Sequence, residues 1–197
     1  ATNNMSWSSY EAISEHKNVS WAVPISLGDS HQGYRVVGTS QAYFDHFEYG
    51  QSQGLSFKEG RVFEGVLDVV LGADVAKTLK YQLGHDLVLA HGISKKSFSL
   101  HDDMPFRVVG ILNKTGTPVD QALYVSLEGI EAIHIGWQNG VKLPSKHSEI
   151  KELDKTKLTP KTITSVMLGL SSKMATFQVQ RSINNYKLEP LTAILPG

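Results

Sequence analysis

The sequence contains no cysteine, which excludes a disulfide framework, a thiolate zinc site and a thiol nucleophile. This absence fits a reducing cytosol and also a periplasmic protein without disulfides, so it does not assign a compartment. Long apolar runs are absent as well, because no uninterrupted apolar stretch exceeds four residues, as at 87–90. A membrane-spanning helix needs about 20 mostly apolar residues. We therefore expect no such helix within this sequence.

The sequence also has no excess of charge of either sign. Its 19 Lys and Arg residues are balanced by 19 Asp and Glu residues. A nucleic-acid-binding protein usually carries a basic patch, and dense Lys/Arg tracts mark proteins that bind anionic membranes. Neither feature is evident, so we expect neither partner, and a length of 197 residues fits one domain or two small ones.

Motifs of common enzymes are missing. The serine-nucleophile turn G-x-S-x-G is absent, and Gly38-Thr39-Ser40 and Gly169-Leu170-Ser171 lack its glycine pattern. Neither G-x-x-x-x-G-K-[ST] nor G-x-G-x-x-G occurs, so no loop is indicated for phosphate or dinucleotide binding. We expect no catalytic residue and no cofactor site. A hydrolase with a Ser or Asp/His cluster assembled only by the fold remains an alternative.

The sequence has eight histidines, and histidine is a common metal ligand. No two of them have the i, i+4 spacing that points two imidazoles of a helix at one ion. The best local cluster is His101-Asp102-Asp103, but consecutive side chains on an extended segment point to opposite faces. We expect an exposed polar turn there and no metal site. His85-Asp86 and His91 bracket a short strand and could approach across a turn, although an incidental pair is the favoured interpretation.

Periodicity predicts the elements at the start of the chain. Ser8 and Glu11 form a capping-box pattern that opens a helix to about residue 16. Apolar residues then alternate from Val19 to a break at Gly28-Asp29, with Trp21 on the buried face. A loop of several residues leads to a strand at 34–37 and a short helix with Tyr43, Phe44 and Phe47. Because proline cannot donate to a ladder, Pro24 indicates an edge or a bulge.

The middle of the chain mixes elements. Val75, Ala76, Leu79 and Leu83 predict an amphipathic helix that ends at Gly84. Short strands are expected at 87–90, 98–100, 106–112 and 122–125, followed by a helix at 127–134. The polar, lysine-rich segment 138–161 is typical of a linker or exposed excursion. Trp137 precedes it, with core burial and an exposed contact both left open.

The last part of the chain returns to a simpler pattern. Residues 163–170 are apolar on both faces, which favours a central strand. A helix follows from about Ser172, with a buried stripe at Ala175, Val179, Ile183 and Tyr186. A closing strand is expected at 191–195. The flanks therefore have the orders α-β-β and β-α-β, and we predict an α+β fold in which both chain ends form one split sandwich around an inserted middle part.

Several short pieces of the sequence are informative because of their order: Arg35-Val36-Val37-Gly38, Tyr43-Phe44, Gly60-Arg61-Val62-Phe63, Val70-Leu71-Gly72-Ala73-Asp74-Val75-Ala76, Leu83-Gly84, Phe106-Arg107-Val108-Val109-Gly110-Ile111-Leu112 and Tyr124-Val125-Ser126-Leu127. In that order they resemble the MacB-like periplasmic core domain of FtsX/LolC/MacB-type ABC transporter permeases. The resemblance covers 34–127 well and the flanks by element order only.

The resemblance implies a porter-like subdomain at 1–58 and 162–197 and an inserted Sabre-like subdomain at 59–161. It implies a non-catalytic periplasmic domain of a bacterial inner-membrane permease, which is dimeric, works with a separate cytoplasmic ATP-binding subunit and acts on a periplasmic adaptor, lipoprotein carrier or cargo. One apolar segment should then precede Ala1 in the parent gene and three should follow Gly197. Two departures are a first strand that is missing or shortened and the segment 138–161. The alternative is a free-standing periplasmic protein that binds a small ligand or metal.

Overall fold

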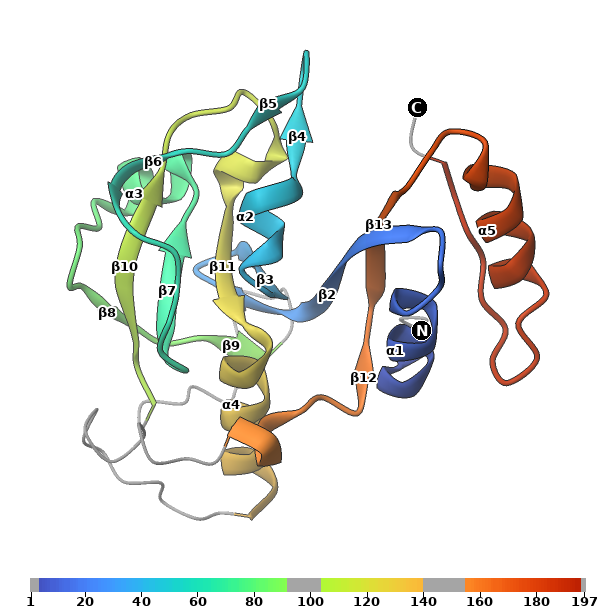
Figure 1. Ribbon diagram of the computed structural model, residues 1–197. Coiled ribbons are helices and arrows are strands. Elements are labelled where there is room, and N and C mark those ends of the chain that lie inside the picture. The colour runs from blue at the N-terminus through green and yellow to red at the C-terminus, as the bar shows by residue number, and fades with distance from the viewer. Residues whose placement is uncertain (1–3, 92–103, 140–154, 196–197) are drawn as a thin grey trace. The chain divides into compact units, whose positions relative to one another are not determined.

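The computed structural model describes residues 4–91, 104–139 and 155–195. By contacts the chain divides into two compact units, each considered separately below (Figure 1). Unit 1 comprises Ala1–Ile25 and Lys161–Gly197, and unit 2 comprises Ser26–Pro160. No helix in the described part of the chain is both long and apolar enough to cross a membrane.

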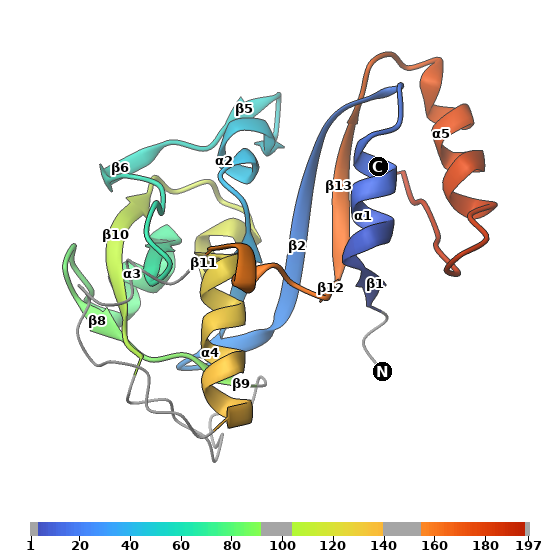
Figure 2. The ribbon, with the colours of Figure 1, turned by 60° about the horizontal axis from the view of Figure 1, so that its bottom comes forward.

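Unit 1 is built from both ends of the chain. β1 (Met5–Ser6) pairs antiparallel with β12 (Thr162–Ile163), and the first half of β2 (Val19–His31) pairs antiparallel with β13 (Ser165–Leu170). Figure 2 shows α1 (Trp7–Ser14) alongside β13, with α5 (Ala175–Asn184) following it in the chain. Buried residues from both ends form its core: Met5, Ile13, Val23, Ile163, Ala175, Val179 and Ile183.

Three features of unit 1 differ from the sequence predictions. The N-cap of α1 is Ser6, not Ser8, because Ser6 has extended backbone angles and its Oγ accepts from the Ser9 N–H at 3.2 Å. β13 is the terminal strand of its sheet path, not a central one. No strand forms at 191–195, where the side chain of Asn184 instead binds the backbone of Ala193. The shortened first strand is present as β1.

Unit 2 contains a mixed sheet in the order β2-β3-β11-β7-β10-β6, seen in Figure 1. The pairs β3–β11 and β7–β10 are parallel, whereas β2–β3, β11–β7 and β10–β6 are antiparallel. The main strands are β3 (Tyr34–Thr39), β6 (Phe57–Gly60), β7 (Asp68–Leu71), β10 (Phe106–Leu112) and β11 (Ala122–Ser126). Central strands read as near-continuous apolar runs because both faces are buried, and β11 is buried at every position.

Shorter elements complete unit 2. The helices are α2 (Ala42–His46), α3 (Ala73–Leu79) and α4 (Leu127–Asn139), with 3₁₀ turns η1 (Pro118–Gln121) and η3 (Lys155–Leu158). The short strands are β4 (Glu48–Tyr49), β5 (Gln53–Gly54), β8 (Asp86–Leu87) and β9 (Ala90–His91). The core gathers apolar residues from the sheet, α3, α4 and η3, including Leu71, Val75, Phe106, Leu123, Ile133 and Leu158.

The hairpin in unit 2 is tighter than the sequence predicts. β2 does not end at Gly28, because that residue has φ 146° and lies in a bulge between Leu27 and Ser30 through which the strand continues. The turn to β3 is formed by Gln32 and Gly33, with φ 50° and 84°. Two successive positive φ angles are the signature of a two-residue hairpin turn.

Other boundaries in unit 2 also shift. α3 ends at Lys80, whose left-handed backbone takes the capping role predicted for Gly84. The expected strand at 87–90 is replaced by β8 and β9, while 98–100 lies outside the described residues. The predicted excursion 138–161 is neither wholly irregular nor wholly exposed, because α4 continues to Asn139 and Leu158 is buried.

Residues 26–58 lie in unit 2 by contacts, because β3 pairs with β11 along its whole length. The sequence analysis grouped these residues with the chain ends. Its assignment of porter-like and Sabre-like subdomains stays a prediction.

Gly72, the N-cap of α3, gives a test of packing in unit 2. A Cβ at this position would lie 2.5 Å from the carbonyl oxygens of Val119 and Asp120. We expect Gly72→Ala to lower the free energy of unfolding by at least about 2 kcal/mol, because backbone cannot yield as a flexible side chain would. Gly54→Ala is the matched control, since nothing lies within 4 Å of its added Cβ. Urea unfolding of both variants measures the difference, and equal stabilities would contradict the prediction.

Candidate functional site

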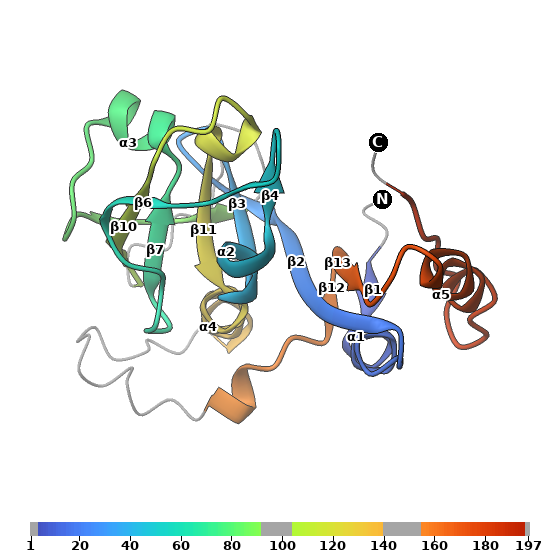
Figure 3. The same cartoon turned by 45° about the horizontal axis from the view of Figure 1, so that its top comes forward.

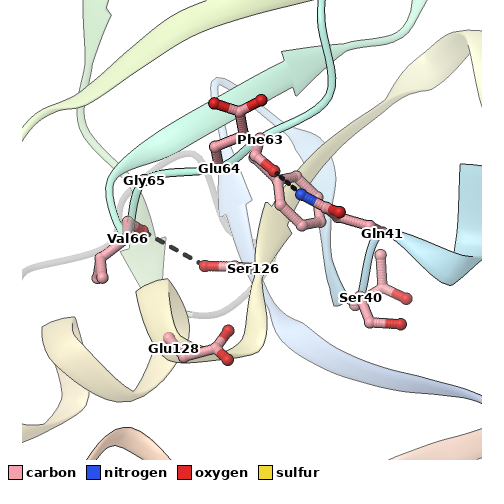
Figure 4. Close-up of a pocket in the computed structure, with 9 residues that line it drawn as sticks. Ser40, Gln41, Phe63, Glu64, Gly65, Val66, Ser126 and Glu128 are labelled. Atoms are coloured by element: carbon pink, nitrogen blue, oxygen red, sulfur yellow. Dashed lines mark hydrogen bonds between the residues drawn. The ribbon is translucent and has the colours of Figure 1, made fainter. Parts of the chain in front are cut away.

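The first candidate site is a depression where the parallel strands β3 and β11 end (Figure 4). Its volume is about 230 Å³. β3 and the residues after it contribute Thr39, Ser40 and Gln41, and the start of α4 contributes Glu128. The loop 63–66 forms the remaining wall. The carboxyl ends of parallel strands are a common place for ligands, which makes this depression a candidate site.

Side-chain hydrogen bonds from outside the loop 63–66 hold this wall of the depression in place. The Asp68 carboxylate accepts from the backbone N–H groups of Glu64 at 3.0 Å and Gly65 at 2.8 Å, and also from the Arg61 guanidinium at 3.1 Å. The Gln41 side chain donates to the Phe63 carbonyl at 2.9 Å, as Figure 4 shows. These hydrogen bonds give the depression a fixed shape. The side chains that form them are already paired within the protein.

The chemistry of this depression does not support nucleophilic catalysis. Ser126 accepts from the Gly129 N–H at 3.0 Å and lies 3.5 Å from the Val66 carbonyl, so it caps α4. The lining offers hydroxyls and the carboxylates of Glu64 and Glu128 but no imidazole to act as a base. Ligand pockets usually enclose about 300–1,000 Å³, more than this one holds.

A second depression of about 480 Å³ lies between α3, β6 and the end of β10. Lys58, Lys77 and Lys114 line it together with Glu59 and Asp74, so its charge is mixed. Lys114 donates to the Asp74 carboxylate at 2.9 Å, and this hydrogen bond raises the pKa of Lys114. This exposed ion pair is typical of a solvated surface and contributes little to stability.

A third polar group surrounds His31, which is buried near the end of β2. Its Nδ1 lies 2.7 Å from the Val88 carbonyl, which only accepts, so Nδ1 carries the proton. Its Nε2 then accepts from the Tyr81 hydroxyl at 2.8 Å. Burial lowers the pKa of His31, because desolvation disfavours the imidazolium, and the charge of nearby His85 acts in the same direction.

His85 and Asp86, which could have approached His91 across a turn, each have another partner in the structure. The His85 ring stacks on Tyr81 with centroids 4.0 Å apart, whereas Asp86 forms an ion pair with Arg107 at 3.3 Å. His101, Asp102 and Asp103 lie outside the described residues. Among the residues that the structure does describe, no group of three His, Cys, Asp or Glu side chains is placed to hold a metal ion.

The two tryptophans singled out in the sequence have different outcomes. Trp21, expected in the core, is only half-buried, and its indole covers Gly169 on β13, where an added Cβ would overlap the ring. The side chain of Trp137 lies outside the described residues.

Comparison with known families resolves what the site chemistry leaves open. The sequence matches the family described as the MacB-like periplasmic core domain over residues 1–186. The chain belongs to this family. Its members are domains of ABC transporter permeases, so this MacB-like domain is a periplasmic domain of such a permease. The recognition and compartment predicted from the sequence are thereby confirmed.

Solved structures agree in fold. The periplasmic region of MacB from Actinobacillus actinomycetemcomitans matches 99% of this chain and 79% of its own, with a TM-score of 0.59 and 15% identity. The extracellular domain of the noncanonic ABC-type transporter YknZ from Gram-positive bacteria matches 92% of this chain and 83% of its own, with a TM-score of 0.53 and 14% identity. These likenesses confirm the mixed α/β fold. No curated protein matches the sequence.

The residues that carry the family resemblance have packing roles in this MacB-like domain. Tyr124 is buried against Tyr43, with ring centroids 5.2 Å apart, and donates to the Val119 carbonyl at 3.1 Å. Burial, followed by the charge of Tyr43, strongly raises the pKa of Tyr124 and keeps its hydroxyl protonated. The Arg61 side chain belongs to the Asp68 loop described above.

One buried polar residue was missed by the sequence analysis. Asp120 accepts from the N–H groups of Thr115 at 2.8 Å and Gly116 at 2.7 Å, and from the Thr115 hydroxyl at 2.9 Å. These bonds organise the turn ahead of β11, so Asp120 is structural. The signal was the local pattern of Thr115, Gly116, Thr117 and Pro118 ahead of an acid, typical of a side-chain-stabilised turn.

The His31 group generates a prediction about pH. The lowered pKa means that the unfolded chain binds a proton more readily than the folded chain below the ordinary value of 6.5. Stability from neutral His31 is therefore complete above that value and is lost as pH falls toward the folded-state pKa, by no more than about 1.4 kcal/mol per pH unit. We expect His31→Phe to remove this component of the slope.

Urea unfolding measured from pH 7.5 to about 5 tests this expectation, over the range where histidines titrate. The slope against pH, not the absolute stability, is the readout, because His31→Phe also removes two hydrogen bonds. His46→Asn serves as a control that leaves the His31 group intact. An unchanged slope in His31→Phe would show that His31 does not carry the effect.

Proposed function

We propose that this MacB-like domain is a non-catalytic transmission element, which carries ATP-driven movement of the permease to a periplasmic adaptor, lipoprotein carrier or cargo. The observation that carries the proposal is family membership over residues 1–186 together with a unit formed from both chain ends. In this proposal both ends of the domain connect to the membrane part of the permease through unit 1. Unit 1 therefore receives the membrane movement at both of its chain ends. The intervening unit 2 is then the part displaced.

The course of β2 supports this role. Residues 19–25 of this strand pair with β13 in unit 1, and residues from Ser26 onward pair with β3 in unit 2. The division between the units therefore falls inside a continuous hydrogen-bonded strand, not in a Gly/Ser-rich linker. A paired strand loses little displacement to bending, whereas a flexible linker absorbs it.

The polar depressions favour the same interpretation over an enzyme or a small-ligand carrier. In these depressions Ser126 caps α4 and Asp74 pairs with Lys114, while the Asp68 carboxylate outside them holds the loop 63–66. A separate cytoplasmic ATP-binding subunit and a dimeric permease are also part of the proposal, because the family implies them.

An insertion that softens β2 tests the proposal in the complete permease. Two glycines placed between Ile25 and Ser26 keep the alternation of side chains on the two faces but add a flexible point where the units meet in sequence. With the ATP-binding subunit present, we expect basal ATP hydrolysis to persist while transport falls by at least about fivefold, because coupling and not catalysis is lost.

The matched control places two glycines between Gly50 and Gln51, in the turn joining β4 and β5. Gly50 has φ 55° and nothing within 4 Å of an added Cβ, so this turn tolerates insertion. Thermal unfolding of the 197-residue chain establishes that both insertions fold. Equal transport by the two insertion variants would contradict a transmission role for β2.

A further inference from the structure

Large exposed apolar side chains are concentrated near the end of unit 1. In the described part of the chain six such residues occur, and only Leu83 lies in unit 2. The other five span 174–195 and are among the most exposed side chains: Met174 (86%), Phe177 (76%), Leu188 (85%), Ile194 (87%) and Leu195 (56%). Scattered apolar residues need no explanation, but a local group of this size marks an interaction surface.

Helical geometry places part of this group on one face of α5. Ala175, Val179 and Ile183 are buried and recur every four residues, so they form the inward stripe. Met174, Phe177 and Arg181 are spaced by three and four, and at 100° per residue they fall on the opposite side of the helix. α5 therefore has an apolar inner stripe and a second, outward stripe of two bulky apolar residues and a cation.

The tail after α5 extends the same surface. Ala193 donates its N–H to the Asn184 side chain at 3.0 Å and accepts from the Gln180 side chain at 3.5 Å. These bonds hold the tail to α5; Figure 1 shows it running back beside the helix, which Figure 3 views nearly along its axis. Ile194 and Leu195 follow directly and are exposed, so we define the α5 surface as Met174, Phe177, Leu188, Ile194 and Leu195.

The charges around the α5 surface are mostly positive. Residues 171–195 contain Lys173, Arg181 and Lys187, all exposed, against the single acid Glu189. The Glu189 carboxylate is already engaged, because it accepts from the N–H and the hydroxyl of Ser6 at 3.0 Å each. Unit 1 as a whole carries five Lys and Arg residues against three Glu, an excess that the neutral balance of the full chain conceals.

We propose that the α5 surface binds the interfacial region of an anionic phospholipid bilayer, with Phe177 and Met174 inserted at the acyl boundary. Lys173, Arg181 and Lys187 then lie at the level of the phosphates. Bulky apolar residues on one side of a helix and cations beside them are the chemistry that anionic lipid surfaces select. The inference concerns this surface alone and does not require the transmission role.

Charge favours a bilayer over a second copy of the chain as the occupant. A two-fold symmetric contact places the same patch against itself, so Arg181 and Lys173 of the two copies would be brought together. Such a contact opposes like charges, whereas an anionic headgroup layer neutralises them. The net charge of the whole chain is zero and so predicted no attraction to a membrane. A sum over the whole chain does not register a local excess of positive charge.

Vesicle sedimentation with the 197-residue chain tests the proposal. We expect binding to phosphatidylcholine vesicles containing phosphatidylglycerol, weaker binding to pure phosphatidylcholine, and loss of binding as salt rises. The double variant Met174→Ser/Phe177→Ser should bind anionic vesicles at least about tenfold more weakly, because it removes the inserting side chains. Arg181→Glu should weaken binding by roughly fivefold or more, since each cation near the surface contributes about that factor.

Leu83→Ser is the matched control, because it removes the one exposed large apolar side chain among the described residues of unit 2 and should leave vesicle binding unchanged. Circular dichroism of each variant tests folding, and the charge variant provides an independent arm if the serine variant is unstable. No binding to anionic vesicles, or equal binding by wild type and the two α5-surface variants, would overturn the proposal. Sedimentation velocity showing a dimer that the double variant abolishes, without vesicle binding, would assign the surface to self-association and also overturn it.

Discussion

The hydrogen bonding of β2 is the constraint on which both compact units depend. Its first half pairs only with β13 in the described part of the chain, and β13 follows it by about 140 residues in sequence. Its second half pairs with β3 through a two-residue turn. Unit 1 therefore requires the last part of the chain to be present, whereas the β2–β3 hairpin of unit 2 is local. Because non-local pairing is entropically costly to form, unit 1 depends on strong side-chain burial from both ends, as at Met5, Val23 and Ile163.

Within unit 2, the sequence pieces typical of the family are explained by packing. Gly72 allows α3 to begin against the backbone of Val119 and Asp120, where no side chain fits. Asp68 and Asp120 each accept several backbone hydrogen bonds and so fix the loops at opposite ends of the β7–β11 pair. In a sequence such aspartates resemble catalytic residues, because they are polar and lie in short motifs that contain glycine. In the structure the carboxylates of these residues already accept hydrogen bonds. They therefore give the loops a defined shape and are not free for other chemistry.

Much of the fold followed from the sequence because its strongest signals are periodic. The inward stripe of α5 at Ala175, Val179 and Ile183 was predicted from its spacing, which reflects burial directly, and the β10 and β11 strands from their β-branched and aromatic composition. Boundaries set by backbone conformation were not predictable in this way. Lys80 takes a left-handed conformation where Gly84 was expected to, and Gly28 forms a bulge where a strand end was expected. In both cases pairing with a neighbouring strand or helix decides the outcome, and that information is not local.

The candidate sites show the same division between local and non-local information. Asp120 had a local turn pattern, but the burial of His31 against Val88 and Tyr81 depends on three segments that are distant in sequence. Charge behaves likewise, because a chain with equal numbers of acids and bases can still place Lys173, Arg181 and Lys187 around Phe177 with one acid nearby, itself hydrogen-bonded to Ser6. In the proposed transmission role, exposed surfaces such as this one supply the specificity. Recognition then depends on which side chains the two units expose, and these are the residues least constrained by the periodicity that identifies the fold.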